Sequence, residues 1–215
     1  GAAERTITVT SYVELVLGAE REHARHQLHT RRDERTGALL AQNLFMEEFA
    51  SRVAFSWISE PVTSFTASRL HFVGRNGDLS DPAGLARETL DGTTGAGDDP
   101  CAALRCSVTL APGETREVVI LLGAAANDDE ARAIIDRCGR PELARAVTQQ
   151  AVDAWNARLS TIHVRTPSPE FDALVNRWTL YQALSCRMWA RSALYQSSGA
   201  FGFRDQLQDA MALDM

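Results

Sequence analysis

The fold is decided by the stretch Leu104-Arg-Cys-Ser-Val-Thr-Leu-Ala-Pro-Gly-Glu-Thr-Arg-Glu-Val-Val-Ile-Leu-Leu-Gly123. Every second residue at its start is apolar, a period that predicts a half-buried strand: Leu104, Cys106, Val108 and Leu110. A turn signal follows at 111–114, and the aliphatic run from Arg116 to Leu122 predicts a second strand that is covered on both faces. Short strands separated by such turn signals are typical of an antiparallel sandwich.

The residues before this stretch repeat the same period of two. Apolar side chains alternate along two further segments, which are Ile7, Val9, Val13, Leu15 and Leu17 in one and Val53, Phe55 and Trp57 in the other. Glycine-containing turn signals separate the segments at 36–37, 74–77 and 91–92. The Gly- and Asp-rich segment from Asp78 to Pro100 is expected to be a long loop, and such loops are often functional. Residues 1–125 therefore predict an antiparallel β-sandwich.

After Gly123 the period becomes helical. Asn127 or Asp128 is expected to cap a helix that ends at Cys138, and Pro141 to open a second helix that ends near Ser160. We assign residues 126–166 to a helical linker.

A third helix is predicted after Pro167, with Ser168 as its N-cap and Pro169 at the first helical position. Its broad apolar stripe predicts burial over much of its surface: Phe171, Leu174, Val175, Trp178, Tyr181, Ser185, Met188 and Trp189. Two helices cannot bury such faces alone. We therefore expect residues 167–215 to begin a larger helical domain that is truncated here, covered by further protein, by the sandwich or by a second copy.

Composition excludes several classes of function. The net charge of −6 over 215 residues argues against a nucleic-acid partner, which needs clustered Lys and Arg. The longest apolar stretch, 118–126, is too short for a membrane helix, so no membrane contact by this segment is expected. The cysteines are scattered without a CxxC pair, so we expect buried free thiols, a cytoplasmic protein and neither a zinc site nor another metal site: Cys101, Cys106, Cys138 and Cys186.

Polar and aromatic side chains gather in the segment 189–209, around Gly199 and Gly202. The candidate substrate-binding residues are Arg191, Tyr195, Gln196, Arg204, Asp205, Gln208 and Asp209. Planar carboxylate, guanidinium and amide groups form bidentate hydrogen bonds with neighbouring sugar hydroxyls, and aromatic rings cover the apolar faces of pyranose rings. A structural alternative stays open for each residue, because Asp205 with Gln208 resembles a helix capping box and Arg204 could pair with a helix carboxylate.

The segment Tyr195-Gln-Ser-Ser-Gly-Ala-Phe-Gly-Phe-Arg-Asp-Gln-Leu-Gln-Asp209 resembles the signature of the inverting glycoside phosphorylases of glycoside hydrolase family 94. Within that family it is most similar to the phosphorylase-like region of the cyclic β-1,2-glucan synthases. The resemblance extends upstream through Thr10-Ser-Tyr-Val-Glu14, Glu48-Phe-Ala-Ser-Arg-Val-Ala-Phe55, Phe72-Val-Gly-Arg-Asn-Gly77 and Gly97-Asp-Asp-Pro-Cys-Ala-Ala103. It covers nearly the whole chain.

The resemblance implies the later part of a super-sandwich, a helical linker and the first helices of a catalytic α/α barrel. It places Arg191, Arg204 and Asp205 at positions that hold the sugar where the bond breaks, and the other four candidates near them. The expected reaction cleaves or transfers β-glucosyl units with inorganic phosphate and inversion, and it needs no further cofactor. The general acid is expected downstream of Met215, so no catalytic residue is assigned and this chain alone is expected to be inactive.

The expected partners are β-glucan or a glucosyl oligosaccharide and a second copy of the chain in a homodimer. Any attachment of the parent protein to the inner membrane would lie in segments outside this chain. A different class of function also stays open: a non-catalytic carbohydrate-binding or assembly module in which the sandwich is the working part.

Overall fold

The computed structural model describes residues 3–18, 20–161, 163–185 and 211. The chain divides into two compact units, Gly1–Arg145 and Ala146–Met215, which are described separately. The boundary between them lies within α5 (Pro141–Leu159). The finer division at 125 and 166 stays a prediction.

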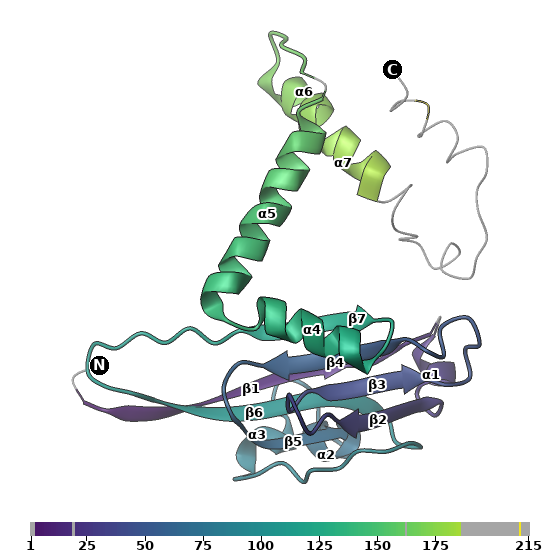
Figure 1. Cartoon of the computed structure of the whole chain (residues 1–215), viewed down its shortest axis with the longest axis vertical. Coiled ribbons are helices and arrows are strands. Elements are labelled where there is room, and N and C mark those ends of the chain that lie inside the picture. Colours follow the sequence, from purple (N-terminus) through teal and green to yellow (C-terminus); the bar gives the residue numbers. More distant parts are fainter. Residues whose placement is uncertain (1–2, 19, 162, 186–210, 212–215) are drawn as a thin grey trace. The chain divides into compact units, whose positions relative to one another are not determined.

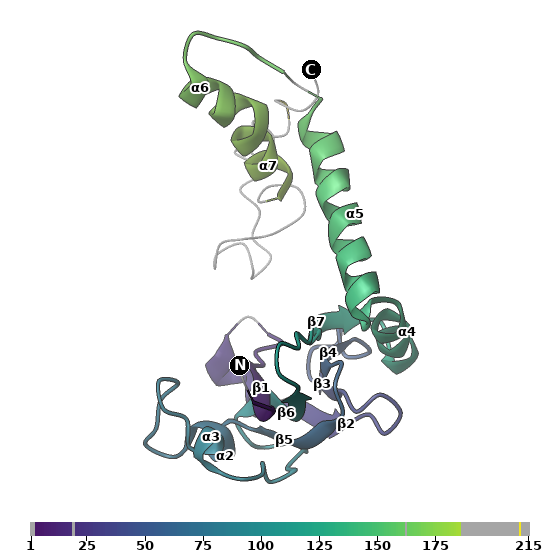
Figure 2. The same cartoon turned by 90° about the vertical axis from the view of Figure 1, so that its left-hand side faces the viewer.

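The first unit contains two antiparallel sheets. One has the strand order β1-β6-β5, built from β1 (Arg5–Glu14), β6 (Pro100–Leu110) and β5 (Val62–Ser68). The other has the order β2-β3-β4-β7, built from β2 (Leu28–Arg32), β3 (Leu39–Asn43), β4 (Val53–Ile58) and β7 (Ile120–Ala125). Figures 1 and 2 show the two sheets as stacked layers, so the predicted antiparallel sandwich is confirmed.

The main hydrophobic core lies between the sheets. The alternating residues of β6 that predicted a half-buried strand face this core, where they meet Leu28, Leu39 and Ile58 of the opposite sheet. Their neighbours at Arg105 and Ser107 belong to the other face, because successive side chains of a strand point in opposite directions. Burial of the apolar face of each sheet stabilises the sandwich at roughly 25 cal/mol per Å².

Helices cover the outer face of each sheet. Helix α4 (Asp128–Cys138) lies over the four-stranded sheet in Figures 1 and 2, where Ala131 and Ile135 pack with Phe55. The other sheet is covered at one end by α2 (Arg69–Val73) and α3 (Ala83–Ala86), with Phe72 stacked on Tyr12 at a centroid distance of 4.4 Å. A short helix, α1 (Arg21–Ala24), follows β1.

The aliphatic run before Gly123 differs from the prediction. Only its second half forms β7, and Ile120 and Leu122 are 48% and 62% exposed, so the prediction of a strand covered on both faces is wrong. Strand β7 is the last strand of its sheet and pairs with β4 on one side only. A continuous aliphatic sequence therefore does not distinguish an outer strand from a central one here.

The predicted loop between Asp78 and Pro100 contains α3 and is anchored to the sheet. Leu90 is buried against Phe72 and Cys101. Gly92 adopts a positive φ of 72°, which favours glycine, and its N–H donates to the carbonyl of Phe65 at 2.8 Å. The segment is thus a packed cover over the sheet.

The predicted helix starts are confirmed. Asn127 caps α4 by accepting from the N–H of Glu130 at 2.9 Å, and Pro141 opens α5. Ser168 caps α6 (Pro169–Ala173), which continues through a π-helical segment, η1 (Leu174–Thr179), into α7 (Leu180–Gln182).

The apolar stripe of this last helical stretch is half exposed in the described structure. Phe171, Leu174 and Trp178 are 50%, 48% and 57% exposed, so the described residues leave this stripe uncovered, and its burial by further protein stays a prediction. A stripe as broad as this one is typical of a helix that packs against other elements on more than one side.

Candidate functional site

The residues predicted to bind substrate lie outside the described residues. This applies to all seven: Arg191, Tyr195, Gln196, Arg204, Asp205, Gln208 and Asp209. The described helix reaches Ser185, which precedes the first of these residues, Arg191, by six positions in the sequence. The helix that precedes these residues in the sequence is the nearest part of the chain that the structure describes.

That helix is tied to the segment before it by two polar side chains. The carboxylate of Asp172 accepts hydrogen bonds from the N–H and the hydroxyl of Thr166, at 2.9 and 2.7 Å. The side-chain amide of Asn176 accepts from the N–H of Val164 at 2.7 Å and donates to its carbonyl at 2.9 Å. An amide that pairs with both backbone groups of one residue fixes an otherwise irregular segment.

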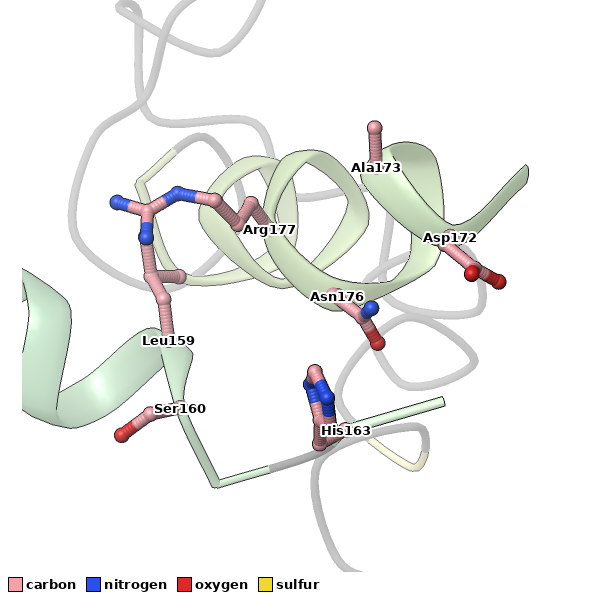
Figure 3. Close-up of a pocket in the computed structure, with 7 residues that line it drawn as sticks. All are labelled: Leu159, Ser160, His163, Asp172, Ala173, Asn176 and Arg177. Carbon is pink, nitrogen blue, oxygen red and sulfur yellow. The ribbon is translucent and has the colours of Figure 1, made fainter. Parts of the chain in front are cut away.

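A pocket of about 400 Å³ opens beside these contacts (Figure 3). Its polar side chains come from the segment after α5 and from the helix: Ser160, His163, Asp172, Asn176 and Arg177. Most of these groups are already occupied, because Arg177 donates to Asn156 at 2.9 Å and Asp172 and Asn176 hold the backbone. The polar side chains that line this pocket therefore stabilise the local chain conformation, and they do not indicate a particular reaction.

A second, mainly apolar hollow of about 430 Å³ lies along the same helix, lined by Leu159, Ala173, Arg177, Trp178 and Tyr181. The ring of Tyr181 lies 5.1 Å from that of Trp155 and 6.0 Å from that of Trp178, both tilted. Aromatic rings beside an arginine suit a sugar ring, and equally suit the packing of another helix. The half-exposed stripe favours the packing role.

The sandwich contains a charged network between β1, α1 and the residues before β6. Arg21 pairs with both Glu14 and Asp99, and Arg69 donates to Glu14 at 2.8 Å. The bond from Arg69 holds the pKa of Glu14 below its usual value. Each charge has an opposite partner, so the network joins elements and leaves no group free for acid–base chemistry.

The thiol and phenol beside this network are poor reactants. Burial raises the pKa of Cys101 to about 12, and burial is also the main cause of the raised pKa of Tyr12. Cys101 and Cys106 are free and buried, as the sequence predicts, whereas the free Cys138 is only half-buried. Cys186 lies outside the described residues. Within the part of the chain that the structure describes, no cluster of side chains that could hold a metal ion is found.

Comparison with known proteins assigns both parts of the chain. Residues 1–141 match the family model described as the supersandwich domain of glycosyl hydrolase 94. Residues 154–215 match the model for the catalytic domain of the glycosyl hydrolase 94 superfamily. A β-supersandwich followed by the start of this catalytic domain defines a carbohydrate-active enzyme class. The chain belongs to the glycosyl hydrolase 94 family, which confirms the resemblance seen in the sequence.

Three curated relatives show the range of activities in this family. The chain is 38% identical to the cyclic β-(1,2)-glucan synthase NdvB of Rhizobium meliloti (strain 1021), over 98% of the chain and 8% of the relative. It is 26% identical to the N,N'-diacetylchitobiose phosphorylase of Vibrio furnissii, over 97% of the chain and 27% of the relative. It is 27% identical to the solabiose phosphorylase of Paenibacillus borealis, over 98% and 27%.

The chain thus spans 8% to 27% of the lengths of these relatives. Across the described residues no helix is both long enough and apolar enough to cross a membrane.

Proposed function

We propose that this chain is the sandwich and the opening part of the catalytic domain of a protein that cleaves or transfers β-glucosyl units with inorganic phosphate. The observation that supports this most is the match of residues 154–215 to the glycosyl hydrolase 94 catalytic domain, since it contains all the candidate sugar-binding residues. The relation to a cyclic β-(1,2)-glucan synthase favours a β-1,2-linked glucan as the saccharide.

The chemistry assigns different tasks to different parts of the protein. Inversion at the anomeric carbon needs an acid that protonates the leaving oxygen and a nucleophile on the opposite face of the sugar. Phosphate is the proposed nucleophile, so no carboxylate base is needed to activate water. Arg191, Arg204 and Asp205 hold the glucosyl unit through charge-assisted hydrogen bonds to its hydroxyls. The acid belongs to a part of the protein beyond these residues.

Calorimetry with sophorose, the disaccharide of β-1,2-linked glucose, tests the proposed sugar-binding role. Arg204→Ala or Asp205→Ala should each weaken binding by about tenfold or more, because each removes charge-assisted hydrogen bonds worth roughly 1.5–3 kcal/mol. Arg137→Ala is the matched control, since Arg137 lies in α4 of the other compact unit. Sophorose binding that is absent in the unmodified chain, or that survives both site substitutions, would contradict the proposal.

A second assay tests the division of tasks. The chain mixed with phosphate and a linear β-1,2-glucan should release no glucose 1-phosphate, because the acid is not among its residues. Release of glucose 1-phosphate by the purified chain would show that the acid lies within residues 1–215.

A further inference from the structure

The outer face of the β1-β6-β5 sheet has two unlike halves. One half is apolar and lies under α2, where Tyr12, Phe72 and Ala103 pack together. The other half carries hydroxyl groups along two neighbouring strands, from Thr6, Thr8 and Thr10 of β1 and from Ser107 and Thr109 of β6. The register pairs Thr8 with Ser107, so their hydroxyls belong to the same face.

The segment 85–89 forms a wall beside this hydroxyl-bearing face. Together they enclose a groove of about 730 Å³, whose lining includes Thr8, Thr63, Leu85, Glu88, Arg105 and Ser107. Its volume falls within the range of roughly 300–1,000 Å³ that is usual for sites that bind small molecules. The groove lies wholly within the first compact unit.

Arg105 fixes the shape of the groove. Its side chain is only 4% exposed, and its guanidinium donates to the carbonyls of Gly84 at 2.6 Å and Arg87 at 2.7 Å. It also donates to the carbonyl of Glu88 at 3.2 Å and, through Nε, to the hydroxyl of Thr10 at 3.2 Å. Because a buried cation holds the wall to the sheet, the groove is formed before any ligand binds, which limits the entropy lost on binding.

Several polar groups in the groove are available to a ligand. Thr8, Ser107 and Glu88 are exposed, and within the described structure their side chains have no hydrogen-bond partner. Leu85, which is 57% exposed, adds an apolar surface at the rim. Two hydroxyls, a carboxylate and an aliphatic side chain match the hydroxyls and C–H faces of a sugar chain.

The same groups disfavour an anion as the ligand. The guanidinium of Arg105 already donates to four oxygen atoms, and that of Arg87, which also lines the groove, donates to the carbonyl of His71 at 2.9 Å. The carboxylate of Glu88 would repel a phosphate. We propose that this groove binds a stretch of neutral oligosaccharide. This inference goes beyond the proposed function, because the groove belongs to the sandwich and not to the candidate reaction site.

Binding of a linear tetramer of β-1,2-linked glucose to the whole chain tests the inference. The variant Thr8→Val/Ser107→Ala/Glu88→Gln removes two hydroxyls and a charge while keeping the backbone carbonyl of Glu88 that accepts from Arg105. In the Asp205→Ala background, this triple variant should weaken tetramer binding by about tenfold or more. Thr6→Val/Thr109→Ala is the matched control, since these residues share the strands and the face, bond each other at 3.0 Å and do not line the groove.

A residue-resolved measurement on the unmodified whole chain keeps the inference testable if the triple variant does not fold. NMR signals of Thr8, Ser107 and Glu88 should shift on addition of the tetramer and stay unchanged on addition of inorganic phosphate. Tetramer binding that the folded triple variant retains in full, or NMR shifts caused by phosphate and not by the tetramer, would overturn the inference. If only the proposed function is wrong, Arg204→Ala and Asp205→Ala will not weaken sophorose binding. The NMR signals of Thr8, Ser107 and Glu88 will still shift when the tetramer is added.

Discussion

Arg132 donates two hydrogen bonds to Oδ1 of Asp33, from Nε at 3.1 Å and from Nη2 at 2.6 Å. Asp33 follows β2, and Arg132 lies on α4, so the pair joins the sheet to the helix that covers it. The same carboxylate accepts from the N–H and the hydroxyl of Thr36 at 2.9 and 2.6 Å. The bond from Arg132, followed by those from Thr36, lowers the pKa of Asp33 to about 2.

Acid should therefore weaken the sandwich in a defined range. Because the folded-state pKa is lower than the unfolded value, the contribution of Asp33 is complete above the unfolded pKa of 3.8 and is lost as the pH falls towards about 2. Urea unfolding between pH 5 and pH 2, followed by circular dichroism, measures this loss.

Asp33→Asn should lower the free energy of unfolding at pH 7 by about 2 kcal/mol, because it removes a charged partner from Arg132. It should also flatten the acid dependence of stability. Asp129→Asn is the control, since Asp129 pairs with the same Arg132 but its side chain is 89% exposed, and exposed pairs contribute only about 0–1 kcal/mol. Equal losses in both variants would contradict the assigned role.

Gly123 is required by the close approach of a ring. A Cβ at this position would lie 2.6 Å from a ring atom of Phe55, the residue it pairs with across β4 and β7. Gly123→Ala should therefore destabilise the sandwich by roughly 1–3 kcal/mol through overpacking. Thermal unfolding measures this, with Leu122→Ala at the neighbouring exposed position as the control. An unchanged melting temperature in Gly123→Ala would show that Phe55 can move away.

Cys101 and Cys106 should resist alkylation in the folded protein. Burial raises the pKa of both thiols, that of Cys101 to about 12, so little thiolate forms at pH 8. Iodoacetamide followed by peptide mass spectrometry should modify both residues only after addition of urea. Rapid native modification of Cys101 would indicate that β6 opens readily.

Asn176→Asp should loosen the segment before the last helix. The carboxylate keeps an acceptor for the N–H of Val164 but loses the donor to its carbonyl. Amide hydrogen exchange in residues 163–166 should become several-fold faster, since one net hydrogen bond contributes about 1 kcal/mol. Arg177→Ala, which removes only the exposed bond to Asn156, is the comparison. If amide hydrogen exchange in this segment is equally fast in Asn176→Asp and in the unmodified chain, contacts other than those of Asn176 hold the segment in place.

Local sequence signals predicted much of this fold. The alternation along β6 identified the residues that face the core between the sheets, and that along β4 identified the face that packs under α4, because a strand has a fixed period of two. Asn127 and Ser168 identified helix starts, because their side chains satisfy backbone N–H groups at those positions. These signals depend only on neighbouring residues.

Long-range features were not predicted. The exposure of Leu122 depends on the order of strands in the sheet, which the aliphatic run does not encode. The groove on the sandwich was also missed, although Thr6, Thr8 and Thr10 alternate on β1 as a signal of a polar face. Its wall depends on Arg105, whose contacts reach residues about 20 positions away in sequence.

Other predictions stay open. The homodimer, the cytoplasmic location and the roles of Arg191, Tyr195, Gln196, Gln208 and Asp209 stay predictions, and so does the alternative of a purely carbohydrate-binding module.

A titration of the isotope-labelled chain with sophorose, followed by backbone amide NMR, tests the proposed sugar-binding role most directly. The account predicts that the largest shifts fall within residues 191–209 and disappear in Asp205→Ala. Shifts confined to residues 1–125, or no shifts at all, would contradict it.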